Sequence, residues 1–101
     1  MTHRLSIRPE ACADLAHAHA WYTAERPGLG DEFQRAVGLT FSLITQAPES
    51  MPVAYRGARR ALLRRFAYAV YYSVTEGTVE VQAVLHTRRN PRRWKSRVRE
   101  A

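Results

Sequence analysis

The sequence predicts an α+β fold, a two-layer sandwich in which a helical hairpin packs on a small antiparallel sheet. Two segments, residues 10–26 and 31–47, carry apolar side chains three and four positions apart, which is the spacing of one helix face. Two later segments, residues 68–74 and 79–85, carry them at every second position, as a strand with one buried face does. With one more strand before the helices and one after them, the order is β-α-α-β-β-β. The length of 101 residues suits a single domain, residues 1–101, with one core.

A proline separates the first strand from the first helix. Residues 4–8 alternate polar and apolar, so we expect Leu5 and Ile7 to face inward. Pro9 ends this strand and suits the first turn of a helix that runs to about residue 26. The abundance of alanine in this segment favours helix and permits a close approach to a neighbouring element. The apolar stripe of the helix consists of Ala11, Leu15, Ala18 and Tyr22, and Trp21 widens it.

The second helix follows a break at residues 27–30, Pro-Gly-Leu-Gly. Asp31 is the expected N-cap, and Asp31 and Glu32 place negative charge at the positive end of the helix. Pro48 ends the helix, and a polar loop then runs from residue 49 to about residue 57. Because only about four residues join the two helices, we expect an antiparallel helical hairpin. The apolar stripe consists of Phe33, Val37, Thr40, Phe41 and Ile44, with Ala36 and Leu43 beside it.

Three adjacent antiparallel strands are predicted for the second half of the chain. Residues 61–63 lead into residues 64–68, which we interpret as the first of these strands and its connection to the next. The other two are joined by a turn at residues 75–78, in which Gly77 supplies the positive φ that a tight hairpin needs. The apolar alternation places Tyr68, Val70, Tyr72 and Val74 on one face of one strand, and Val79, Val81, Ala83 and Leu85 on one face of the next.

Positive charge is concentrated in the second half of the chain, whose formal net charge as a whole is +7. Residues 1–50 carry four Arg against six Asp and Glu, whereas residues 51–101 carry twelve Arg and Lys against three Glu. This asymmetry indicates an anionic partner, either nucleic acid or an acidic protein segment, and a solvated, solubilising face is the alternative. All but one of the basic residues are arginine, which suits bidentate contacts to carboxylate or phosphate.

Cysteine usage and hydropathy favour a cytoplasmic location. Cys12 is the only cysteine, so no internal disulfide is possible, which suits a reducing compartment. No apolar run approaches the ~20 residues of a membrane span, and the N-terminus lacks the apolar stretch of a signal peptide.

His86 is the candidate for acid–base chemistry. It ends the last predicted strand and is followed at once by Thr87, Arg88 and Arg89, so a general base would stand beside phosphate-binding cations. The alternative is a strand-end histidine hydrogen-bonded to a backbone carbonyl. His17 and His19 point about 200° apart on a helix and cannot share a metal ion, so no metal or other cofactor is expected. Nucleophile triads, phosphate-cradling glycine loops and paired carboxylates are lacking, which argues against a conventional hydrolase.

Two arginine clusters are candidate binding residues. Arg64 and Arg65 follow Leu63, where strand alternation would turn one outward and the other toward the sheet margin. The second cluster consists of Arg88, Arg89, Arg92 and Arg93, and it precedes Trp94. Basic groups beside an exposed aromatic suit RNA or single-stranded DNA, and they suit an acidic peptide anchored by Trp94 equally well. Alternatively, Trp94 folds back onto the sheet edge.

Four segments form a set in a defined order. They are residues 8–15 (RPEACADL), residues 21–33 with Trp21-Tyr22, RPGLG at 26–30 and Phe33, residues 62–68 (LLRRFAY) and residues 86–94 (HTRRNPRRW). Together they resemble the RelE/ParE toxin superfamily, specifically its ParE-like, plasmid-stabilisation branch, over nearly the whole chain. Ala67 departs from the proline usual in the family, which affects the stiffness of that turn.

The resemblance implies the growth-arresting toxin of a type II toxin–antitoxin system, neutralised by a cognate antitoxin with an acidic C-terminal tail. ParE-like toxins inhibit DNA gyrase, whereas RelE-like relatives cleave mRNA on the ribosome. The expected target-binding residues are Arg64, Arg65, Arg88, Arg89, Arg92, Arg93 and Trp94. The expected antitoxin-binding residues are Trp21, Tyr22, Arg60, Leu62, Arg64, Arg65 and Phe66.

The residues near the C-terminus favour gyrase inhibition without catalysis. Cleaving RNA through its 2′-hydroxyl requires a base, an acid and cations for the phosphate. RelE-type toxins use lysine and arginine clusters with a tyrosine near the C-terminus, whereas this chain has one lysine, Lys95, and Trp94 at the tyrosine position. An indole N–H is not a proton shuttle. An mRNA interferase remains the alternative, with His86, Arg88 and Arg89 as its catalytic residues.

Overall fold

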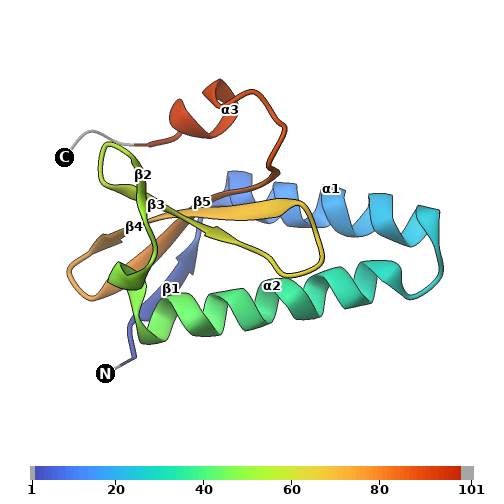
Figure 1. Ribbon diagram of the computed structural model, residues 1–101, viewed down its shortest axis with the longest axis horizontal. Helices are drawn as coiled ribbons and strands as arrows, with labels where there is room; N and C mark the ends of the chain where they lie inside the picture. The colour runs from blue at the N-terminus through green and yellow to red at the C-terminus, as the bar shows by residue number, and fades with distance from the viewer. Residues whose placement is uncertain (1, 99–101) are drawn as a thin grey trace.

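The computed structural model describes residues 2–98 and shows two helices packed against a five-stranded sheet (Figure 1). This confirms the predicted α+β class and helical hairpin. The helices are α1 (Pro9–Glu25), α2 (Leu29–Gln46), the 3₁₀ turn η1 (Pro48–Ser50) and the short α3 (Arg92–Lys95). The strands are β1 (Arg4–Ile7), β2 (Val53–Tyr55), β3 (Ala58–Leu62), β4 (Tyr68–Thr75) and β5 (Thr78–His86).

The sheet has the order β1-β5-β4-β3-β2. The pairs β3–β4 and β4–β5 are antiparallel, as predicted, and the unpredicted pair β2–β3 is antiparallel too. The strand β1 lies parallel to β5, with Leu5 opposite Val79. The direction of β1 is not set by a hairpin, because both helices separate it in sequence from every other strand. Ile7 packs against the core, whereas Leu5 stays 39% exposed at this edge of the sheet.

The predicted polar loop at residues 49–57 is wrong in part, because it contains η1 and β2. Arg56 and Gly57 have φ of 46° and 81°, and two consecutive positive φ angles define the turn that suits a two-residue hairpin. The same geometry joins β4 to β5, where Glu76 and Gly77 have φ of 48° and 78°, so the predicted hairpin at Gly77 is confirmed.

A β-bulge in β5 overturns the predicted facing of that strand. Tyr72 lies opposite Val81 and Tyr71 lies opposite Ala83, so Gln82 is an extra residue without a partner on β4. Beyond the bulge the alternation shifts by one position. Val84 therefore joins Val79 and Val81 in the core under the helices, and the opposite face of the sheet carries Ala83 and Leu85.

The helical stripes are largely as predicted. Ala11 and Ala18 of α1 are buried, and the buried residues of α2 are Gly30, Phe33, Val37, Thr40 and Ile44. Two expectations are wrong. The residue preceding α2 is Gly28, whose φ of 86° turns the chain, and Asp31 lies inside the first turn rather than at the N-cap. Trp21 does not widen the buried stripe, because it lies 53% exposed.

Trp94 covers the second face of the sheet. Its ring stacks on Tyr71 with centroids 4.2 Å apart and meets Tyr55 edge-on, and only 6% of the residue is exposed. The interpretation of Trp94 as an exposed aromatic is therefore wrong, and the alternative of folding back is confirmed, on the face of the sheet rather than its edge. This places α3 across the sheet from α2 (Figure 1).

Candidate functional site

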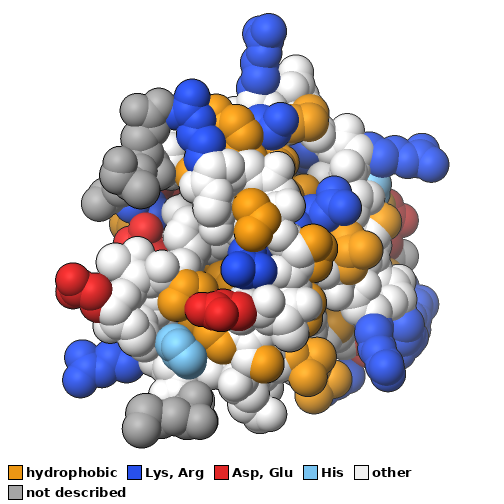
Figure 2. Space-filling model, turned by 60° about the vertical axis from the view of Figure 1, so that its left-hand side comes forward, with side chains coloured by type: hydrophobic (Ala, Val, Ile, Leu, Met, Phe, Trp, Pro, Cys, Tyr) orange, Lys and Arg blue, Asp and Glu red, His pale blue; other side chains and the backbone are white. Residues whose placement is uncertain are grey.

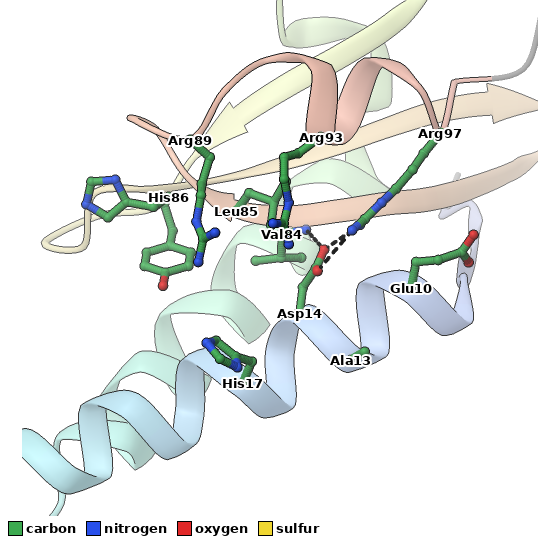
Figure 3. A pocket seen from close by; sticks show the side chains of 11 residues that line it. Glu10, Ala13, Asp14, His17, Val84, Leu85, His86, Arg89, Arg93 and Arg97 are labelled. Atoms are coloured by element: carbon green, nitrogen blue, oxygen red, sulfur yellow. Dashed lines mark hydrogen bonds and ion pairs between the residues drawn. The ribbon is translucent and has the colours of Figure 1, made fainter.

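A cleft of about 500 Å³ lies between α1 and the segment that follows β5 (Figure 3). We call it the α1–β5 cleft. Its lining residues are Glu10, Ala13, Asp14, His17, Tyr68, Val84, Leu85, His86, Arg89, Arg93 and Arg97. Two of the predicted target-binding residues, Arg89 and Arg93, are thus brought together with the predicted general base His86.

The helix side of the cleft is a polar stripe on α1. Glu10, Asp14, His17 and Trp21 follow one another at spacings of four, three and four, so they share one face of the helix. The neighbouring apolar stripe, which includes Ala11, has the same spacing shifted by one residue. Sequence reasoning found the apolar stripe and missed the polar one, although both stripes show the same helical spacing in the sequence.

One wall of the cleft is held by an ion pair between Asp14 and Arg97. Asp14 Oδ2 lies 2.6 Å from Arg97 Nη1, and the two side chains are 8% and 16% exposed. Two backbone groups at the edge of β5, beyond the end of β1, bind this ion pair. The Val84 N–H donates to Asp14 Oδ2 at 3.0 Å, and the Gln82 carbonyl accepts from Arg97 Nη1 at 3.1 Å. The ion pair therefore continues the sheet edge where β1 stops and ties the C-terminal segment to α1.

Arg89 and Arg93 are the uncompensated cations of the cleft. Both residues are exposed, and in Figure 3 both side chains extend from the C-terminal segment toward α1. No carboxylate within residues 2–98 lies at ion-pair distance from either guanidinium. Tight turns set their positions, since the Arg89 N–H donates to the His86 carbonyl and the Arg93 N–H to the Asn90 carbonyl, each at 2.9 Å.

His86 presents one free nitrogen. Its Nδ1 accepts the Arg88 N–H at 3.0 Å, so the predicted bond to a backbone carbonyl is not the one formed. With Nδ1 as acceptor, a neutral His86 carries its proton on Nε2 and is a hydrogen-bond donor. The ring meets Tyr68 edge-on at 5.5 Å. Burial raises the pKa of Tyr68, and nearby Arg89 opposes part of that rise, so the phenol stays protonated near neutral pH.

An aromatic hollow of about 280 Å³ adjoins the cleft. It is lined by Trp21 and Tyr22 together with four residues that also line the cleft, namely His17, Tyr68, His86 and Arg89. The cationic cleft therefore opens at one end onto the exposed indole of Trp21. Chemically, the combined surface can bind a phosphate and an adjoining planar group.

A second groove, the α2–β3 groove, runs between α2 and the end of β3. Its members are Glu32, Arg35, Ala36, Leu39, Thr40, Leu43, Leu62, Arg64, Arg65 and Phe66. Leu39, Leu43 and Leu62 are 58–67% exposed, an arrangement that leaves apolar surface in water. The strand β3 ends at Leu62, so Arg64 and Arg65 lie in a loop and are both exposed, contrary to the prediction of strand alternation.

The predicted binding residues thus fall on separate surfaces. Of the target-binding set, Arg64 and Arg65 line the α2–β3 groove, whereas Arg88 and Arg92 are exposed outside both depressions. Of the antitoxin-binding set, Leu62, Arg64, Arg65 and Phe66 lie in the α2–β3 groove, Trp21 and Tyr22 border the aromatic hollow, and Arg60 is exposed on β3.

The end of the molecule with the β4–β5 turn shows hydrophobic side chains among Lys and Arg (Figure 2).

Neither a metal cluster nor a membrane helix is found in the described part of the chain. Within residues 2–98, no group of three His, Cys, Asp or Glu side chains is placed to hold a metal ion. His19 lies 3.2 Å from Asp31, away from His17. No helix of the same residues is long and apolar enough to cross a membrane.

Comparison with known proteins agrees with the fold. Residues 5–91 match the family described as "ParE toxin of type II toxin-antitoxin system, parDE". The chain belongs to this family. It is 30% identical over 95 residues to Toxin ParE2 from two Mycobacterium tuberculosis strains, covering 90% of this chain and 88% of the relative. A solved structure titled "Chromosomal ParDE TA system from P. aeruginosa" has the same fold, with a TM-score of 0.75 at 16% identity over 84% of this chain and 96% of the other.

Proposed function

We propose that this ParE-family toxin arrests growth by binding DNA gyrase, without covalent chemistry, and that a cognate antitoxin neutralises it. The observation that carries the proposal is the family match across residues 5–91. Two features of the structure support a binder over a nuclease. The indole at the position of the RelE-type tyrosine is packed on Tyr71, away from solvent. The phenol in the cleft, Tyr68, has a raised pKa, which disfavours it as a base near neutral pH.

Two purified-protein assays run side by side test the target. We expect inhibition of gyrase supercoiling with intact mRNA in a ribosome-programmed cleavage assay, and little effect of His86→Ala on the inhibition. Growth arrest on induction of the toxin alone, relieved by co-expression of the adjacent open reading frame, tests the toxin–antitoxin relationship. Unimpaired growth with verified folded protein, or silence in the supercoiling assay, contradicts the proposal.

A ribosome-dependent mRNA interferase is the second candidate, and one observation favours it. His17 on α1 lines the same cleft as His86, together with Arg89 and Arg93 (Figure 3). The cleft therefore contains two imidazoles that can act as base and acid beside cations for a phosphate. For this function we expect codon-positioned mRNA cuts that disappear in His86→Ala and in His17→Ala.

We further propose that an acidic antitoxin tail binds along the α2–β3 groove. The exposed leucines would anchor its apolar side chains, and Arg64 and Arg65 would pair with its carboxylates. Removing one partner of a desolvated arginine–carboxylate pair costs about 2–5 kcal/mol. Charge reversal at Arg64 and Arg65 is therefore expected to weaken the complex by more than about a hundredfold and to slow its formation. The matched control is charge reversal at Arg88 and Arg92, and equal losses in both pairs would place the interface elsewhere.

A further inference from the structure

We propose that the α1–β5 cleft and the aromatic hollow together form a binding site for single-stranded nucleic acid. In this site Arg89 and Arg93 contact the phosphates, and one unstacked base lies against Trp21. The inference concerns direct contact with nucleic acid and holds whichever target the toxin has.

The cationic half of the site is available to a ligand. Arg89 and Arg93 have no carboxylate partner within residues 2–98, and Asp14 beside them is already neutralised by Arg97 at 2.6 Å. The Nε2–H of neutral His86 and the protonated phenol of Tyr68 add neutral hydrogen-bond donors to the same lining. Two cations and two neutral donors form a site that suits the oxygens of a phosphodiester.

The aromatic half of the site explains why the ligand is single-stranded. Trp21 is 53% exposed, although burying an indole is normally favourable. Tyr22 supports it edge-on at 5.1 Å and is itself stacked on Phe33 at 5.2 Å, so the exposed ring stands on a rigid aromatic base. Base stacking on such a ring contributes to binding of single strands, whereas the bases of a duplex are already stacked on one another.

Charge and polarity separate this site from the proposed antitoxin groove. The α2–β3 groove contains exposed leucines and its own carboxylate, Glu32, which pairs with Arg65. That surface suits an amphipathic acidic peptide. The α1–β5 cleft also contains carboxylates, Glu10 and Asp14, but these pair with Arg8 and Arg97. The cleft combines two guanidinium groups that have no carboxylate partner within residues 2–98, those of Arg89 and Arg93, with histidines and an exposed indole. This combination favours nucleic acid over an acidic chain.

The test measures binding of labelled oligothymidylate and oligouridylate to the full-length chain by fluorescence anisotropy at several salt concentrations. Replacing both cleft arginines, R89Q/R93Q, is expected to weaken binding by at least about tenfold. The slope of log affinity against log salt should fall by about 1.4, because two phosphate contacts are lost. The matched control, R88Q/R92Q, removes the same charge from the same segment outside the cleft and should change affinity less than about threefold.

A second pair of variants tests the aromatic half. Trp21→Ala is expected to lower affinity by about fivefold or more, and Trp21→Tyr to restore most of it. Because all five replaced residues are exposed, circular dichroism and the thermal midpoint should match the unmodified chain. The preference between the two oligonucleotides reports the combined effect of the ribose 2′-hydroxyl and the thymine methyl group, and binding of either one supports the site.

Three results would overturn the proposal. Equal losses in R89Q/R93Q and R88Q/R92Q would mean diffuse attraction to a basic surface. If Trp21→Ala bound the oligonucleotides as tightly as the unmodified chain, no base would stack on Trp21. Absence of binding to both oligonucleotides at low salt, or tighter binding of a polyglutamate peptide that depends on Arg89 and Arg93, would assign the cleft to another ligand.

Discussion

At the scale of single residues, Glu32 already pairs with one of the arginines of the proposed antitoxin groove. Its carboxylate pairs with Arg65 at 3.1 Å and with Arg26 at 3.2 Å, and its side chain is 24% exposed. Arg65 is far more open, with 73% of its side chain exposed and a left-handed φ of 69°. An incoming carboxylate must therefore compete with Glu32 for the same guanidinium.

Glu32→Gln is expected to tighten binding of an acidic antitoxin by about two- to fivefold, because it removes the internal competitor and an exposed pair contributes only ~0.2–1 kcal/mol. Isothermal titration at two salt concentrations measures this change. Asp31→Asn is the matched control, since Asp31 lies next in sequence but pairs with His19 outside the groove. Equal effects of the two substitutions would show that only overall charge matters.

At the scale of elements, the crossing of α1 and α2 depends on Gly30. A Cβ at this position would lie 2.7 Å from the His19 carbonyl oxygen of α1, which is closer than real Cβ contacts permit. Gly38 lies two turns later on the same helix and has open space around it. Of these two glycines of α2, Gly30 therefore has no room for a side chain, whereas Gly38 does.

Gly30→Ala is expected to lower the free energy of unfolding by about 1–3 kcal/mol through overpacking, despite the better helix propensity of alanine. Gly38→Ala should raise it by roughly 0.5–1 kcal/mol, since only propensity changes there. Urea denaturation of both variants measures the difference. The same sign of effect at both positions would contradict the close approach at Gly30.

The C-terminal segment depends on the ion pair of Asp14 and Arg97. Asp14→Ala leaves a nearly buried guanidinium and the Val84 N–H without their partner, so we expect a loss of about 3–5 kcal/mol in unfolding free energy. Glu25→Ala, at an exposed position in the last turn of the same helix, should change it by less than about 0.5 kcal/mol. A small effect of Asp14→Ala would mean that α3 is held by Trp94 alone.

At the scale of the whole molecule, four tyrosines make the stability of the fold depend on pH in the alkaline range. Burial raises the pKa of Tyr22, Tyr68, Tyr71 and Tyr72, with nearby arginines opposing the rise for the last three. The hydroxyl of Tyr72 also donates to the Pro48 carbonyl at 2.6 Å in the core. Folding therefore favours the protonated phenols.

A raised folded-state pKa means stability that is fully present below the unfolded value of about 10 and is lost as pH rises through the folded values. We expect the urea midpoint to be steady from about pH 8 to 9.5 and to fall above about pH 10. Tyrosinate absorbance at each pH should show the phenols ionising together with unfolding. A constant urea midpoint to about pH 11 would contradict this account.

Local patterns sufficed for the elements, because helix and hairpin formation depend on residues near in sequence. The stripe from Ala11 to Tyr22, the β4–β5 turn at Gly77 and the order β-α-α-β-β-β were all predicted and are all present. The same reasoning missed β2, because its turn uses Arg56 with Gly57 rather than a familiar turn pair. It also missed the polar stripe of α1 beside the apolar one.

Only the tertiary structure decided how distant residues combine. The bulge at Gln82 turned Val84 toward the helices and offered backbone groups to Asp14 and Arg97, which lie 83 positions apart. Packing buried Trp94 against Tyr71, which the alternative of folding back had allowed, and left Trp21 exposed, contrary to the prediction that it widens the buried stripe. The sequence by itself determined the family, the fold class and the basic second half, whereas the site required long-range contacts that no local periodicity encodes.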